Sequence, residues 1–162
     1  MMIDTQREIE RRLSALQGLQ LSSVNRAADM LTLGFGDLRP VTNFRGVIKN
    51  VGEWALHIQC PWRLEEAAQV VATQEDLSGS DERAYATADH LRGLLVERGP
   101  CTVDSVSVSD DAGMIVSLSR GFRLVVTPDG IEGAEDWRFF APGVDAAHLV
   151  IKGGAVAPES FD

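Results

Sequence analysis

The stretch EWALHIQCPWRLE, residues 53 to 65, places an imidazole (His57) and a thiol (Cys60) three positions apart. On a turn this spacing suits two ligands of a metal ion, and an imidazole beside a thiol can also activate a cysteine nucleophile. In a regular strand, however, residues three apart point to opposite faces. Unless Pro61 breaks the strand early, we therefore expect neither a metal site nor a cysteine–histidine dyad here.

Other groups that could act in catalysis lack the arrangement that catalysis needs. The serines between positions 105 and 119 alternate along predicted strands, and none lies in a Gly-x-Ser-x-Gly turn. The fifteen glycines form no phosphate-binding motif. Four adjacent carboxylate pairs fall in predicted loops or at element ends, where we expect solvated turns: Glu65-Glu66, Asp81-Glu82, Asp110-Asp111 and Glu135-Asp136. We therefore expect no catalytic residue, no metal and no cofactor.

The same stretch has a strand pattern with two different faces. Its large apolar residues alternate and predict one buried face: Trp54, Leu56, Ile58, Cys60 and Trp62. Between them, His57, Gln59 and Arg63 form a polar row on the opposite face. This row is either the wet side of a sheet or a recognition surface, because its side chains offer directional hydrogen bonds from a rigid element. The strand is predicted over residues 53 to 60, and Pro61 marks its end, a bulge or an edge.

A second Trp-Arg pair extends this polar row. Trp137-Arg138 repeats Trp62-Arg63, and if Trp137 faces the core as Trp62 does, Arg138 stands in the equivalent exposed row. The candidate binding residues in this row are therefore His57, Gln59, Arg63 and Arg138. Two acids of a predicted turn, Asp110 and Asp111, are also candidate binding residues.

The charge balance limits the partners of this chain. Its 162 residues carry a net charge of −9, and the only lysines are Lys49 and Lys152. Nucleic-acid binding needs a basic stripe that displaces counterions from phosphates, and the thirteen arginines are scattered. We therefore expect no nucleic-acid partner. An acidic surface favours a basic protein partner, although solubility alone explains it equally well.

The compartment is also predicted from the sequence. No apolar run approaches the ~18 residues of a membrane span, so we expect no membrane association. The N-terminal segment MMIDTQREIERRL is charged and lacks the apolar core of a secretory signal, which predicts a cytoplasmic protein. Because disulfides are rare in the cytosol, Cys60 and Cys101 are predicted to be core thiols rather than a bridge.

Two helices and many short strands must position these residues. Helical periodicity predicts helices over residues 4 to 17 and 84 to 98, each ended by a glycine. Residues 36 to 52 are predicted to form a long loop with a short strand at 44 to 48, and residues 74 to 83 a polar connection. The remaining strand-to-strand links are too short for repeated crossovers. We therefore predict an α+β fold with two helices packed on mainly antiparallel sheet, in one compact domain over residues 1 to 162.

The two halves of the chain share an order of elements. In residues 3 to 75 and 82 to 154, a helix ends at a glycine and a valine stands six residues before a methionine. A Trp-Arg strand and a short apolar strand follow in each half. This order predicts a tandem duplication of a helix-plus-meander unit with pseudo-twofold symmetry. The alternative is that α+β proteins often alternate in this way without duplication.

Several of these sheet segments resemble other proteins. The segments MIVSLSRGFRLVVTPDG, EDWRFFAPG and HLVIKGG resemble a sheet module of small uncharacterised bacterial proteins, some of which occur beside secreted toxin systems and are taken as immunity proteins. GEWALHIQCPWRL is similar to segments of hypothetical bacterial proteins. The resemblance covers about half of the chain and carries sheet-forming patterns without a catalytic residue. It implies a protein whose role is to bind another protein.

Three functional hypotheses follow. The first is a non-enzymatic cytoplasmic module that binds another protein, in the manner of an immunity-type inhibitor. The second is a small-molecule binder or enzyme with a pocket between the two halves, using His57, Arg63 and a carboxylate; a deep apolar cleft would favour it. The third is a structural homodimer that pairs an exposed edge strand.

Overall fold

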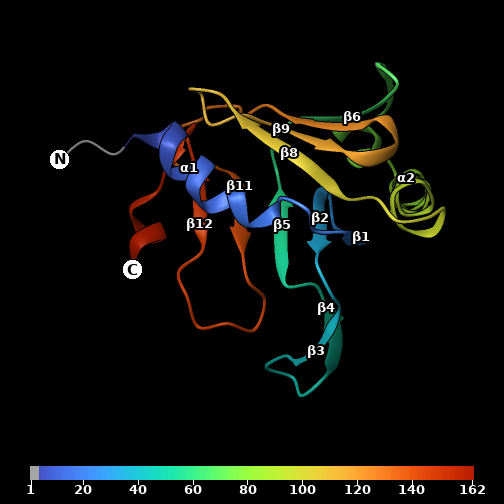
Figure 1. Cartoon of the computed structure of the whole chain (residues 1–162), viewed down its shortest axis with the longest axis horizontal. Coiled ribbons are helices and arrows are strands. Elements are labelled where there is room, and N and C mark those ends of the chain that lie inside the picture. The colour runs from blue at the N-terminus through green and yellow to red at the C-terminus, as the bar shows by residue number, and fades with distance from the viewer. Residues whose placement is uncertain (1–3) are drawn as a thin grey trace.

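Two antiparallel sheets lie in two layers in the computed structural model, which describes residues 4–162, and a helix lies at each end (Figure 1). The six-stranded sheet has the order β1 (Leu21–Ala27), β2 (Met30–Phe35), β5 (Trp54–Ile58), β11 (Glu135–Phe140), β12 (Leu149–Lys152) and β13 (Ala155–Val156). The five-stranded sheet has the order β7 (Gln69–Thr73), β6 (Trp62–Glu66), β10 (Phe122–Val126), β9 (Met114–Leu118) and β8 (Val103–Val108). This arrangement confirms the predicted α+β fold.

Each of the two helices lies against an edge strand of a sheet. α1 (Thr5–Leu13) is extended by a 3-10 turn, and its Gln6 amide donates to the carbonyl of Val108 on β8 at 2.8 Å. α2 (Asp81–Arg92) is followed by a π-helical turn, and its Arg92 Nε donates to the carbonyl of Val24 on β1 at 3.1 Å. A helix beside an edge strand limits its pairing with other chains. Within residues 4–162, no helix is long and apolar enough to cross a membrane.

The start of α2 differs from the prediction by three residues. The apolar stripe pointed to residue 84, but the helix begins at Asp81 because the Ser80 side chain accepts the Arg83 backbone N–H at 3.2 Å. A serine in this position satisfies one of the free N–H groups of the first turn. The carboxylates of Asp81 and Glu82 therefore lie in a helical first turn, where the helix dipole favours negative charge. They do not lie in the loop that the sequence predicted.

The interior lies between the two sheets. Ile58 and Trp62 are almost fully buried, as are Leu56 and Cys60, and Trp54 is half-buried with its ring stacked on Phe139. The predicted core face of this stretch is therefore confirmed.

The polar row opposite that core face is divided between the two sheets, which corrects the expectation for Arg63. The strand ends at Ile58, and the backbone N–H groups of Gln59 and Cys60 both donate to the Asp136 carbonyl, at 2.9 and 3.1 Å. Pro61 then turns the chain, so that β6 starts in the other sheet. The buried side stays buried across this corner, but Arg63 reaches the outer face of the five-stranded sheet and shares no row with His57.

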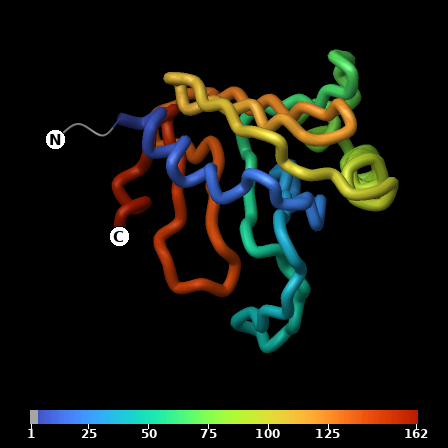
Figure 2. The backbone as a smooth tube through the Cα atoms, in the orientation of Figure 1, coloured from blue at the N-terminus to red at the C-terminus, as the bar shows by residue number. Residues whose placement is uncertain are grey.

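Residues 36 to 52 also differ from the prediction of a loop with a strand at 44 to 48. They form a hairpin of β3 (Arg39–Thr42) and β4 (Ile48–Val51), which projects from the body of the protein (Figures 1 and 2). The predicted strand is mostly the tip. There, the side chain of Asn43 accepts the backbone N–H groups of Arg45 and Val47, at 2.9 and 3.0 Å, and orders the turn.

The two sheets have a matching strand order. Read from one edge, each begins with three meander strands from one half of the chain, β1, β2, β5 in one sheet and β8, β9, β10 in the other. Strands of the other half follow: β11, β12 and β13 in the six-stranded sheet, and β6 and β7 in the five-stranded sheet. Gln20 and Thr102 form a β-bridge, and the hydrogen bonds around it run in both directions. The Leu21 N–H donates to the Cys101 carbonyl at 2.8 Å, and the Val103 N–H donates to the Leu19 carbonyl at 2.9 Å. A tandem duplication would account for this shared order. The duplication itself stays a prediction, and residue 3 of its first half lies outside the described residues.

Candidate functional site

The outer face of the six-stranded sheet contains a hollow. One cross-strand row of this face reads Asn25, Thr32, His57 and Arg138 on adjacent strands. The next row reads Ser23, Gly34, Ala55 and Phe140. Because three of the four side chains in the second row are small, the floor is depressed there. The hollow has a volume of about 650 Å³.

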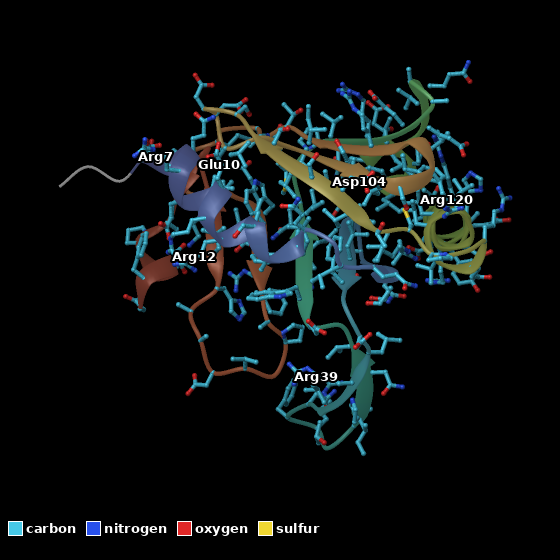
Figure 3. The ribbon with its side chains drawn as sticks, in the orientation of Figure 1. Arg7, Glu10, Arg12, Arg39, Asp104 and Arg120 are labelled. Atoms are coloured by element: carbon cyan, nitrogen blue, oxygen red, sulfur yellow. The ribbon has the colours of Figure 1, made fainter. Side chains whose placement is uncertain are left out.

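The hairpin β3–β4 forms one wall of this hollow, through Lys49, Asn50 and Gly52. The Arg39 guanidinium donates to the carbonyl of Pro142, which ties the hairpin to the segment after β11. Arg39 is labelled on the hairpin in Figure 3. A Cβ on Gly52 would come within 2.6 Å of the Phe35 carbonyl oxygen, so only glycine allows the base of the hairpin to approach β2 this closely. The position of the hairpin is therefore fixed by the Arg39 hydrogen bond and by the close approach of Gly52 to β2.

Two cations and no carboxylate line the hollow. Arg26 comes from the end of β1 and Lys49 from β4, and the other lining residues are neutral, histidine included. Among residues 4–162, neither cation makes an ion pair within 4 Å. Within the described part of the chain, Arg26 donates only to the carbonyl of Ala28 in its own turn, at 3.0 Å. The hollow is thus locally cationic on a chain whose net charge is −9.

An aromatic and imidazole stack borders the hollow. The His57 and Phe140 rings meet edge to face, with centroids 4.9 Å apart, and the Phe140 ring is stacked on the His148 ring with centroids 4.2 Å apart. Burial lowers the pKa of His57, and the Arg138 cation lowers it further. The pKa of His148 is lowered by the same two causes, in the same order. Both imidazoles are therefore neutral at pH 7.

Arg138 connects this stack to a carboxylate. Its Nη1 donates to His148 Nδ1 at 3.0 Å, and its Nη2 donates to Glu135 Oε1 at 2.7 Å. The Gln59 amide donates to the second Glu135 oxygen at 2.9 Å. These bonds fix His148, Arg138 and Gln59 in one ordered group, in which the charge of Arg138 is already compensated. Such pre-positioned side chains suit recognition.

The structure brings together three of the six residues that the sequence singled out. His57, Gln59 and Arg138 share the outer face of the six-stranded sheet. Arg63 lies on the outer face of the other sheet, where its Nε pairs with Glu65 at 2.7 Å.

The other two singled-out residues, Asp110 and Asp111, lie in the turn between β8 and β9. Asp110 is exposed. The Asp111 carboxylate accepts the Ser109 hydroxyl and the Gly113 N–H, the latter at 2.9 Å, and these bonds lower its pKa. Neither Asp110 nor Asp111 lines the hollow, so this acidic pair forms a turn apart from His57.

A pocket between the two halves that uses His57 and Arg63 is not present in the part of the chain that the structure describes. Between the sheets, beside α2, lies an apolar void of about 10 Å³, lined mainly by leucine and valine. This is about the volume of a single water-sized probe. His57 and Arg63 point away from this interior, on the outer faces of different sheets. These two side chains therefore cannot act on one ligand.

Asp136 corrects the expectation that the Glu135-Asp136 pair lies in a solvated turn. It lies on β11 and is 2% exposed. Its carboxylate accepts the backbone N–H groups of Asp129 and Gly154, at 3.0 and 2.9 Å. Asp136 therefore ties two loops to the sheet, a structural role that accounts for a buried carboxylate.

The thiols and histidines give no catalytic arrangement in the described chain. Cys60 and Cys101 are free and buried, which confirms the prediction of core thiols, and burial raises the pKa of Cys60 to about 12. Among residues 4–162, His57 makes no hydrogen bond to a serine, threonine or cysteine, and no three His, Cys, Asp or Glu side chains gather as metal ligands. What the hollow offers is a set of binding groups.

The sequence interpretation missed Lys49, Phe140 and His148. Phe140 could have been found, because it alternates with Arg138 along EDWRFF and so shares its face. Lys49 gave no such signal, since the hairpin has two exposed faces. Comparison with protein-family models finds no match, and comparison with curated proteins and with solved structures finds no similar protein.

Proposed function

We propose that this protein is a non-enzymatic binding module that holds another protein against the outer face of its six-stranded sheet and the β3–β4 hairpin, as an immunity-type inhibitor would. The main support is the place of the hairpin. In the five-stranded sheet, β9 and β10 are joined by only three residues, Ser119–Gly121. At the matching place in the six-stranded sheet, between β2 and β5, the chain inserts the whole hairpin. Function commonly resides in such additions to a rigid scaffold.

The hairpin carries exposed apolar groups that packing in this chain does not explain. Phe44 at its tip is 91% exposed and Ile48 is 66% exposed. Leu38 and Val47 are about half exposed. Aromatic and aliphatic side chains that protrude from a surface are typical anchors of protein interfaces, where a partner buries them. The apolar tip and the adjoining hollow together form a surface suited to a protein rather than to a small molecule.

Net charge adds a second, longer-range support. A charge of −9 attracts a partner of net positive charge during approach, and such attraction acts mainly on the association rate. The cations of the hollow act at shorter range, because salt screens charges beyond about 8 Å under physiological conditions. A basic partner is therefore drawn to the molecule as a whole, while the hairpin and hollow determine the contact itself.

The proposal is tested by capture from native lysate with paired variants. Wild-type protein and Val70→Ser, which alters an exposed apolar residue on β7 of the other sheet, should retain the same protein partner. Phe44→Ser combined with Ile48→Ser should lose it, because both anchors are removed. The captured protein should then be inhibited by wild-type protein and not by the double variant. Absence of a partner, or equal capture by all three proteins, contradicts the proposal.

A further inference from the structure

We propose that the hollow on the six-stranded sheet binds an acidic segment of the partner, an extended stretch of chain whose carboxylates meet Lys49 and Arg26. This inference rests on the proposed function and specifies what its site accepts. The two cations come from different elements, β4 and the end of β1, and the lining contains no acid. Two uncompensated cations that share a hollow repel each other, and an anionic occupant relieves that repulsion.

The local charge is unusual for this chain. Between Asp37 and Glu53 the hairpin segment holds Arg39, Arg45 and Lys49 and no acid, although the whole chain has 24 acidic residues. Lys49 is also one of only two lysines. The cations are therefore concentrated beside the hollow. Arg138 does not add to this field, because Glu135 compensates it at 2.7 Å.

The shape of the hollow fits an extended peptide. It crosses four strands, from β1 to β11, which corresponds to about 14 Å at the usual spacing of strands. At about 3.3 Å per extended residue, roughly four residues fit across it. Gly34 and Ala55 leave room for the peptide backbone, and Asn25 and Asn50 can donate hydrogen bonds to its carbonyl groups.

Charge distinguishes a peptide from nucleic acid as the occupant. Nucleic-acid affinity depends on neutralising many phosphates, and two cations within a chain of net charge −9 cannot do this. A short acidic segment needs only one or two cationic side chains to compensate its charge. The exposed apolar residues at the hairpin tip also favour a protein, because they can bury against apolar side chains that flank the acidic segment.

The test is fluorescence anisotropy with the full chain and a fluorescein-labelled hexaglutamate peptide at about 0.05 M salt, where screening is weak. A hexaglutamine peptide and a short single-stranded DNA are the comparison probes. We expect hexaglutamate to bind and to be weakened by added salt. Lys49→Gln combined with Arg26→Gln should weaken it roughly tenfold, because both charge-assisted contacts are lost. Arg63→Gln combined with Arg123→Gln removes the same charge from the other sheet and should leave binding unchanged.

A single substitution serves as a control for loss of folding. Asn50 is exposed, so Asn50→Asp adds a negative charge to the hollow without removing a buried group. It should also weaken hexaglutamate binding while leaving the thermal melt unchanged. Equal affinity of both double variants, absence of hexaglutamate binding, or DNA binding as tight as hexaglutamate would each overturn the inference. If the partner is lost with the Phe44 and Ile48 variant but retained when Lys49 and Arg26 are changed, only the acidic-segment inference fails.

Discussion

Two tryptophans in matching positions differ in one hydrogen bond, and this difference predicts their contributions to stability. Trp62 on β6 pairs with Val126, and Trp137 on β11 pairs with Ile58. They are 3% and 0% exposed. The Trp137 Nε1–H donates to the carbonyl of Ala112 at 2.9 Å, whereas the buried Trp62 Nε1 has no partner among the described residues.

Substitution of each tryptophan by phenylalanine isolates this bond. Both changes remove a similar apolar volume from the same interior. Trp137→Phe also leaves the fully buried carbonyl of Ala112 unpaired, which costs about 1–3 kcal/mol. Trp62→Phe removes an N–H group that is already unpaired, and this recovers a similar amount. We therefore expect Trp137→Phe to lower the free energy of unfolding by about 2–6 kcal/mol more than Trp62→Phe does.

Urea unfolding followed by far-ultraviolet circular dichroism measures the difference without relying on tryptophan emission. Comparison of midpoints is valid if the dependence on urea is the same for both variants. Trp54→Phe is a control for the tryptophan-to-phenylalanine change at a position that is not fully buried. Trp54 is half-buried, and its ring is stacked on Phe139. Equal losses of stability for Trp62→Phe and Trp137→Phe, or a larger loss for Trp62→Phe, would refute the reasoning.

Three further predictions concern protonation, the thiols and the His57 face. Burial and the Arg138 cation lower the folded-state pKa of His57 and His148, so the unfolded chain binds more protons below pH ~6.5. Stability should therefore fall as the pH drops from about 7 through that value, and His57→Gln should flatten the slope; a slope unchanged by the substitution would contradict this. Cys60 and Cys101 should resist a thiol reagent at pH ~8 until urea unfolds the chain, and rapid labelling of the folded protein would show the burial to be wrong. His57→Ala should cost less than ~1 kcal/mol and Trp62→Ala ~3–5 kcal/mol in denaturant melts, and the reverse order would contradict the assigned faces.

The alternation of residues 54 to 62 predicted the core but not the corner. Apolar side chains stay on the inside while the chain passes from one sheet to the other at Pro61, so the period of two continues across the break. Periodicity reports which side is buried and contains no information on which sheet a strand joins. For this reason the sequence placed His57 and Gln59 correctly relative to the core and placed Arg63 in the wrong row.

The hairpin and Asp136 were missed for a different physical reason. The hairpin strands expose both faces, so their order comes from the side chain of Asn43 and from contacts at Gly52 rather than from an apolar stripe. Asp136 is buried because backbone N–H groups of Asp129 and Gly154 satisfy its carboxylate. Those donors lie seven and eighteen positions away, and only the folded chain brings them together.

The contrast between the two outer faces supports placing the function on one of them. Both faces belong to sheets of matching strand order, so packing alone predicts similar surfaces. On the five-stranded sheet, Glu65 lies between Arg63 and Arg123, at 2.7 and 3.5 Å, and compensates their charge. On the six-stranded sheet, the inserted hairpin adds Lys49 beside the hollow without a carboxylate to match it. An uncompensated charge next to exposed apolar groups gives no evident benefit to the isolated chain. Under the proposed function, a partner would supply the missing carboxylate and cover the apolar tip, and this is why binding is expected on this face.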